Sequence, residues 1–193
     1  MKNADQGLVS VMSILTIIVI GIVTASNQIA KNTVTALPQA TAGASATNFE
    51  INGVISSLVL GMPPNTNTVD MATVQKFILS GDWSMNVNHG KLTNFKASFY
   101  TGPVNGGTSN HTHQMNNFRV SNGSSLIHLS PDNSVSISGI VDVGTNGKKA
   151  WNDVNATIVI SKGRTISINL ADEDTQRHFM GQQIYGIVKK INI

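Results

Sequence analysis

The stretch NHTHQMNNF, residues 110–118, carries the residue types best suited to metal chemistry in this sequence. His111 and His113 are two residues apart, and Met115 follows at the same interval. In a β-strand, alternate side chains project from one face, about 6.5–7 Å apart. The spacing therefore predicts that His111, His113 and Met115 share a face, where two neutral imidazoles can converge on one cation.

The donor atoms favour copper. Imidazole binds copper and zinc alike, whereas the thioether of Met115 suits copper better than zinc or calcium. The chain contains no cysteine, which excludes disulfides, thiolate catalysis, cysteine-ligated zinc and the thiolate of a blue-copper site. The sequence therefore predicts a histidine site with a preference for copper.

A third ligand has to come from a distant part of the chain. His178 is the best candidate, because the surrounding run DEDTQRHF also carries acids. Asp172 and Asp174 are expected to orient an imidazole by a hydrogen bond to the ring nitrogen that does not bind the metal. The same two carboxylates, with His89 and His128, are the further candidates for the third ligand itself.

A second interpretation of this stretch needs no metal. A His-x-His pair on a solvent-facing strand is common, and methionine is also an ordinary filler of hydrophobic cores. If Met115 faces the core, both histidines point inward too, which favours a ligand or a hydrogen-bonded polar cluster. If Met115 faces solvent, metal binding there is adventitious.

From residue 49 onward, apolar residues recur with a period of two rather than about 3.6, which predicts strands. The alternation is clearest over 134–143, and residues 154–170 predict a hairpin that turns at 161–164. The segment 69–79 is compatible with a strand or a short helix. Strands are expected near 49–60, 82–89, 92–101, 111–120, 125–129, 134–143, 154–160, 165–170 and 183–191.

Turns are predicted where Asn and Gly adjoin, because both residues tolerate the positive φ angles of tight hairpins. Such pairs occur at 52–53, 105–106, 122–123 and 146–147, and Asn88-His89-Gly90 is closely related. Strands with short connections predict a mainly β fold, either a single antiparallel β-sandwich or a closed β-barrel. The expected core anchors are Trp83, Phe95, Phe99, Phe118, Trp151, Phe179 and Tyr185.

Residues 8–25, LVSVMSILTIIVIGIVTA, contain no charged side chain. A run of this length is typical of a membrane span or of the apolar part of a signal peptide. We expect residues 1–31 to form a hydrophobic helix that anchors the chain in the membrane or is removed after export. Residues 32–48 are expected to be a flexible small and polar linker, and residues 49–193 an exported antiparallel β domain.

The expected location is the cell membrane, with a single pass and the C-terminal domain outside, or secretion after signal cleavage. Charged residues make up 12% of the chain and the net charge is +3 without a basic cluster, so nucleic acid is not an expected partner. Asn110, Asn122 and Asn155 begin N-glycosylation motifs that fit export. A glycan on Asn110 would crowd His111.

The His-x-His pair resembles the first metal-binding motif of the cupin barrels, but the match fails on both sides. Asn105 stands where the cupin glycine is expected, and Asn117 and Phe118 stand where the cupin glutamate falls. This departure removes a metal ligand and argues against a cupin enzyme.

A broader resemblance covers residues 82–191 through the succession FKASF, HTHQMNNF, VSISGIVDVGTNGKKAWNDV and HFMGQQIYGIV. In these segments the chain resembles uncharacterised exported proteins of ammonia-oxidising archaea. The resemblance implies a membrane-anchored extracytoplasmic β domain in a copper-dependent physiology, and it implies no established activity.

Three functions remain open at the level of the sequence. The first is a non-enzymatic, membrane-tethered extracytoplasmic β domain that binds copper through His111 and His113, with His178 or Met115 assisting. The second is a structural or adhesive cell-surface module, such as a pilus-like subunit, that does not need its histidines. The third is a histidine-metal enzyme, which requires three protein ligands, an open coordination position and a nearby acid or base.

Overall fold

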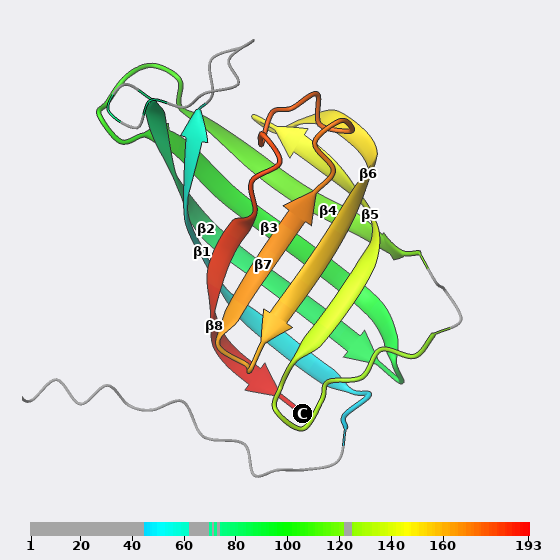
Figure 1. Cartoon of the computed structure of the whole chain (residues 1–193). Coiled ribbons are helices and arrows are strands. Elements are labelled where there is room, and N and C mark those ends of the chain that lie inside the picture. The colour runs from blue at the N-terminus through cyan, green and yellow to red at the C-terminus, as the bar shows by residue number, and fades with distance from the viewer. Residues whose placement is uncertain (1–44, 62–69, 71, 73, 122–124) are drawn as a thin grey trace, which may run out of the picture. The chain divides into compact units, whose positions relative to one another are not determined.

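The computed structural model of the protein describes residues 45–61, 70, 72, 74–121 and 125–193. These residues form eight antiparallel strands (Figure 1). The strands are β1 (Phe49–Gly61), β2 (Gln75–Asn88), β3 (Lys91–Pro103), β4 (His111–Val120), β5 (Val135–Thr145), β6 (Lys148–Ser161), β7 (Thr165–Leu170) and β8 (Ile184–Asn192).

The sheet closes into a barrel. Each strand pairs with the next one in the chain, and β1 also pairs with β8, for example through Ile51 and Ile191. A sandwich would leave edge strands with unpaired backbone groups, whereas closure pairs the two edges with each other. The structure thus selects the barrel from the two predicted architectures.

The predicted hydrophobic helix, residues 1–31, lies outside the described residues, as does the linker up to residue 44. In the part of the chain that the structure describes, no helix has the length and apolarity needed to cross a membrane. Two described residues before β1 contact the barrel: Ala46 forms an isolated β-bridge with Leu129, and the Asn48 side chain accepts a hydrogen bond from the His89 amide.

The interior of the barrel is the hydrophobic core, and it takes alternate residues of each strand. Four predicted anchors are almost fully buried there: Trp83, Phe95, Phe99 and Phe179, each with at most 5% of its surface exposed. The half-buried pair of Phe118 and Trp151 packs against this core. The prediction for Tyr185 is wrong, since it is 51% exposed. Its neighbours in β8 face inward, so the strand pleat points Tyr185 outward.

The predicted strand at 125–129 is also wrong. Ile127 and Leu129 are buried, but this segment is a loop, and within the described part of the chain its one ladder contact is the bridge from Leu129 to Ala46. The Ile127 amide donates instead to the carbonyl of Gly90. Period-two apolarity here reflects a loop that inserts two side chains into the core. Conversely, residues 75–79 of the ambiguous segment are strand and belong to β2.

The Asn-Gly pairs occur in two different settings, a hairpin turn and the interior of a strand. Asn146 and Gly147 both adopt positive φ, 52° and 74°, and join β5 to β6 as predicted. The prediction at 52–53 is wrong, because Asn52 and Gly53 lie inside β1. A Cβ atom at Gly53 would lie 1.9 Å from the carbonyl oxygen of Ile187 in β8. Glycine is therefore needed where two backbones approach closely at the barrel seam.

We predict that Gly53→Ala lowers the free energy of unfolding by about 1–3 kcal/mol, since the added methyl has to displace backbone rather than a flexible side chain. Urea denaturation followed by circular dichroism measures the change. The matched control is Ser56→Ala in the same strand, where the side chain is exposed. Equal stability of the two variants would contradict the role of Gly53 in closing the barrel.

Candidate metal centre

Strand β4 places both histidines of the His-x-His pair on its inward face. His113 and Met115 are buried, with 1% of each exposed, and His111 is half-buried at the start of the strand. Thr112, in contrast, is exposed on the opposite face, as are Gln114 and Asn116. The predicted shared face is confirmed. Because Met115 belongs to the core, the histidines point into the barrel rather than into bulk water.

The connection between β7 and β8 delivers the third histidine. It lies at one end of the barrel, beside the β5–β6 hairpin (Figure 1). Thr175, which has no exposed surface, and the buried Phe179 anchor this connection. The Gln182 side chain ties it to β1, accepting from the Leu60 amide at 2.9 Å and donating to the Leu60 carbonyl at 2.8 Å. These contacts hold His178 over the barrel interior.

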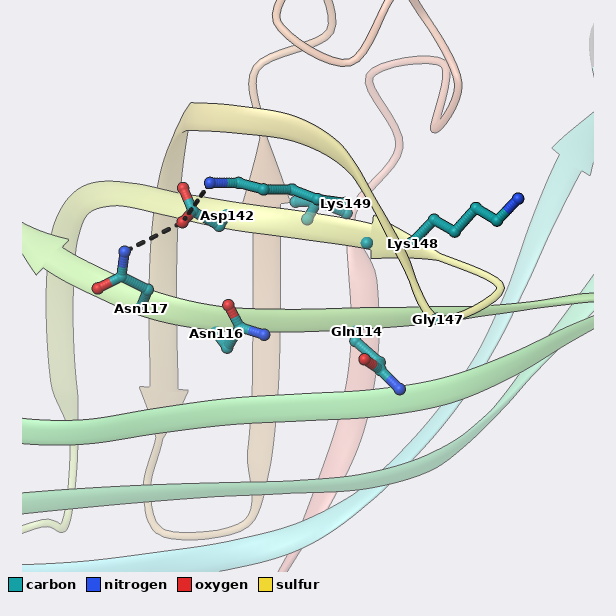
Figure 2. Close-up of a pocket in the computed structure, with 9 residues that line it drawn as sticks. Gln114, Asn116, Asn117, Asp142, Gly147, Lys148 and Lys149 are labelled. Carbon is teal, nitrogen blue, oxygen red and sulfur yellow. Dashed lines mark hydrogen bonds and ion pairs between the residues drawn. The ribbon is translucent and has the colours of Figure 1, made fainter.

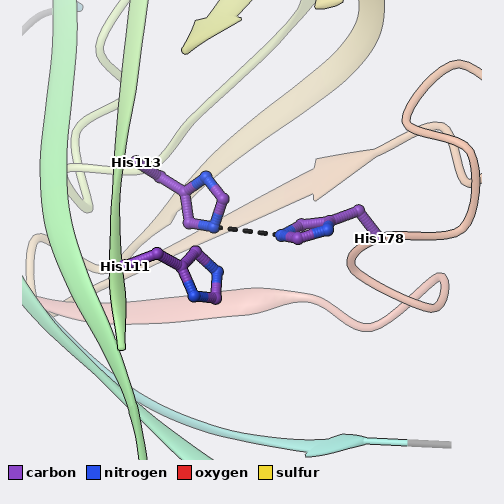
Figure 3. A group of neighbouring side chains, drawn as sticks. All are labelled: His111, His113 and His178. Carbon is purple, nitrogen blue, oxygen red and sulfur yellow. Dashed lines mark hydrogen bonds between the residues drawn. The ribbon is translucent and has the colours of Figure 1, made fainter. Parts of the chain in front are cut away.

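His111, His113 and His178 form a cluster of three imidazoles (Figure 3). One ring nitrogen from each residue lies within 4.8 Å of the other two. The Nε2 atoms of His113 and His178 are 3.2 Å apart. Two nitrogens bound to one tetrahedral metal ion at about 2.0–2.1 Å are separated by about 3.3 Å. Two of the three nitrogens thus already have the separation that a shared ion requires.

Hydrogen bonds fix which nitrogen of each β4 histidine is available. Nδ1 of His111 donates to the carbonyl oxygen of Ser109 at 2.9 Å, so its Nε2 carries a lone pair. Nδ1 of His113 lies 3.2 Å from Oγ1 of Thr145 and hydrogen-bonds to the Gly144 backbone. Nε2 of His113 is therefore the atom presented to His178. Nε2 of His113 and Nε2 of His178 share a hydrogen bond, whereas Nε2 of His111 has no partner among the described residues. Anchoring of one ring nitrogen, as seen for both β4 histidines, is usual in metal-ligating histidines.

Nε2 of His111 is buried and has no hydrogen-bond partner among the described residues. A buried acceptor without a partner costs about 1–3 kcal/mol. A metal ion held between the three rings would satisfy this atom.

Desolvation favours the neutral forms of His113 and His178. Desolvation lowers the pKa of His113 to about 3, with additional lowering by the positive charge that His178 or His111 would carry. The pKa of His178 is also lowered, mainly by burial of its ring and then by His111. Metal ions bind neutral imidazole, so the lowered pKa values of these two residues favour the binding form of their rings.

Aromatic rings pack around the imidazoles. The ring centroids of Phe99 and Phe179 lie 5.3 Å and 4.9 Å from that of His113, and the centroid of Trp151 lies 5.1 Å from that of His178. These contacts restrict rotation of the rings, although His178 remains an exposed residue. They also place a fluorescent indole beside the candidate site.

The two aspartates that the sequence singled out have other partners. Asp174 accepts hydrogen bonds from the backbone and side-chain nitrogens of Asn155 in β6, at 2.8 and 2.9 Å. Asp172 forms an ion pair with Arg177 at 3.4 Å. The orienting contacts to the β4 imidazoles come instead from backbone groups and from Thr145. Sequence spacing could not find Thr145, because its place opposite His113 depends on the register of β4 and β5.

The remaining candidates do not join the cluster. His89 and His128 are exposed, in the β2–β3 turn and in the loop before β5. Met115 packs within the core, two residues beyond His113 on the same face of β4.

A cavity of about 310 Å³, away from the histidine cluster, is lined mainly by polar residues of β4, β5 and β6 (Figure 2). Its buried carboxylate, Asp142, accepts from Nδ2 of Asn117 at 3.0 Å and pairs with Lys149 and Arg119, each at 3.3 Å. The Asn117 hydrogen bond, followed by the Asp153 backbone amide and Lys149, lowers the Asp142 pKa to about 2 against the opposing effect of burial. Arg119 also pairs with Asp153. The carboxylate has hydrogen-bond and ion-pair partners within the protein. It lies where the registers of the β4–β5 and β5–β6 ladders shift, so its role is typical of a structural network.

Comparisons with known proteins give no assignment: no family model, no curated protein and no solved structure matches the chain. Fold and site together therefore define the class of protein. It is a closed eight-stranded antiparallel β-barrel with a cluster of three histidines that could hold a metal ion.

We predict that the metal-free protein loses stability as the pH falls from about 6.5 toward 3, because the unfolded chain takes up a proton at His113 that the folded protein resists. Urea midpoints in the presence of a chelator, at about pH 7.5 and about pH 4.5, measure this loss. His113→Gln should reduce it by on the order of 2 kcal/mol. His89→Gln is the control and should behave as the original protein. An unchanged pH dependence in His113→Gln would refute burial of a neutral imidazole.

Proposed function

We propose that this protein is a membrane-tethered extracytoplasmic β-barrel that binds one metal ion, preferentially copper, without catalysing a reaction. His111, His113 and His178 are the ligands. The observation that carries the proposal is the convergence of three imidazole nitrogens within 4.8 Å at the end of the barrel. The anchored Nδ1 atoms and the unpartnered Nε2 of His111 support it, because both are features of a site prepared for a cation.

The choice of copper rests on the donor set. Three neutral nitrogens bind copper, zinc and nickel, and at a given nitrogen site Cu²⁺ binds more tightly than the neighbouring divalent metals. Met115 lies two residues from His113 on the same strand face but packs within the core, so the preference for copper rests on the three imidazoles alone.

A histidine-metal enzyme is the second candidate, and a cavity beside the cluster favours it. Catalytic zinc sites have three protein ligands and keep a fourth position open for water or substrate. The cluster has three histidines and adjoins a cavity of about 220 Å³. This candidate differs from the first in requiring turnover of a bound molecule. A structural or adhesive module would need neither the metal nor the cavity.

We predict that the protein binds one equivalent of Cu²⁺ and that binding quenches fluorescence from Trp151. The indole centroid is 5.1 Å from the ring of His178, whereas Trp83, the other of the two tryptophans, is in the core. In His111→Ala/His113→Ala the affinity should fall by more than about 100-fold, because two of three ligands are lost. Titration followed by fluorescence and by calorimetry measures both effects.

The control for this titration is His89→Ala/His128→Ala, which removes the same number of histidines from exposed positions. It should bind copper as the original protein does. Equal stoichiometry and affinity in the two double variants would refute the metal centre and leave the structural module as the better hypothesis.

Tethering to a membrane is supported by the uncharged apolar run of residues 8–25 and by the resemblance to exported archaeal proteins. We predict that the full chain sediments with membranes and resists extraction by high salt, while residues 32–193 remain in the supernatant. Protease added to intact cells should digest the barrel, since it would lie outside. Recovery of the full chain in the soluble fraction of the cell would contradict the anchor.

A further inference from the structure

The cavity beside the histidine cluster is lined by imidazoles and by apolar side chains. His111, His113 and His178 form one wall. Most of the remainder is apolar and includes Val59, Phe77, Leu79 and Phe179. The cavity measures about 220 Å³, and an apolar cavity of about 150 Å³ is enough to hold benzene. A small organic molecule therefore fits here with a polar end toward the imidazoles.

Thr101 supplies an independent sign of a missing ligand. Its side chain lines the cavity and is 6% exposed, and its Oγ1 has no hydrogen-bond partner among the described residues. Thr101 stands opposite His111 across the β3–β4 ladder. A metal ion would satisfy Nε2 of His111 but would leave this hydroxyl donor unsatisfied, which is costly in a buried position. The Thr101 hydroxyl could therefore donate a hydrogen bond to a ligand atom that lies beside the metal.

The charge of the loaded site favours an anion. Three neutral imidazoles leave the full charge of a divalent ion uncompensated, and burying an uncompensated charge is costly. Among the described residues that line this cavity none carries a carboxylate, and the one charged residue, Arg177, pairs with Asp172. An anionic group at the open coordination position would compensate the charge.

We propose that this cavity binds a small carboxylate with an apolar body, of about the size of benzoate. One carboxylate oxygen occupies the open position of the metal, the other accepts a hydrogen bond from Thr101, and the apolar body packs against Phe77 and Leu79. This inference rests on the proposed metal centre. It names a class of ligand for that centre and involves no chemical change in the ligand.

The test uses the full chain loaded with one equivalent of Cu²⁺ and benzoate as the probe. Electron paramagnetic resonance and visible absorption report the copper ligands directly. Benzoate should change both spectra in a saturable way. Benzamide has the same shape without the charge, and acetate has the charge without the ring; each should bind at least about tenfold more weakly, because one of the two contacts is lost.

Thr101→Val tests the hydroxyl. It should weaken benzoate by about tenfold, as expected for loss of a hydrogen bond to a charged acceptor. Thr112→Val is the matched control, because Thr112 is exposed on the opposite face of the adjacent strand. It should leave benzoate binding unchanged. Equal benzoate affinity in the two variants would overturn the role of Thr101.

The comparison of benzoate, benzamide and acetate uses the unaltered protein, so its outcome does not depend on whether a variant folds. Copper that binds but does not respond to benzoate overturns this inference alone. Benzamide as effective as benzoate overturns the carboxylate contact, and acetate as effective as benzoate overturns the apolar contact. Failure of copper to bind at all overturns both this inference and the metal centre.

Discussion

The hydrogen-bonded seam between β1 and β8 is the constraint on which the rest of this structure depends. It pairs the two edges of the sheet and so creates an enclosed interior with two ends. The close backbone approach at Gly53 shows how tightly the seam is packed. Once the interior exists, the pleat of each strand divides its side chains between core and solvent. The position of the histidines follows from that division.

Two groups of buried polar side chains in the described barrel differ in how their hydrogen bonds are satisfied. Asp142 is satisfied by amide, ammonium and guanidinium groups from neighbouring positions. The histidine cluster is only partly satisfied, since Nε2 of His111 and Oγ1 of Thr101 lack partners. A completed network stabilises strand irregularities, whereas unsatisfied groups that line one cavity are typical of a binding site. The cavity beside the histidines is therefore a place where two unpartnered buried groups lie together.

Local patterns predicted the strands and turns well where local physics decides them. The Asn146-Gly147 turn depends on the backbone freedom of two residues, and the hairpin at 154–170 depends on simple alternation. The predictions at Gly53, at Tyr185 and at 125–129 failed for a common reason. In each case a contact with a distant segment, or the side of the strand that faces the core, decides the outcome. Neither can be read from a short window of sequence.

The sequence by itself determined that His111, His113 and Met115 share a face, because the strand period is two. It also supplied His178 as a candidate, but no local rule connects residues that are 65 positions apart. The tertiary structure decided that the shared face is the buried one and that the β7–β8 connection brings His178 within 3.2 Å of His113. Barrel closure and the packing of Thr175 and Phe179 produce that proximity, since both act across the whole fold.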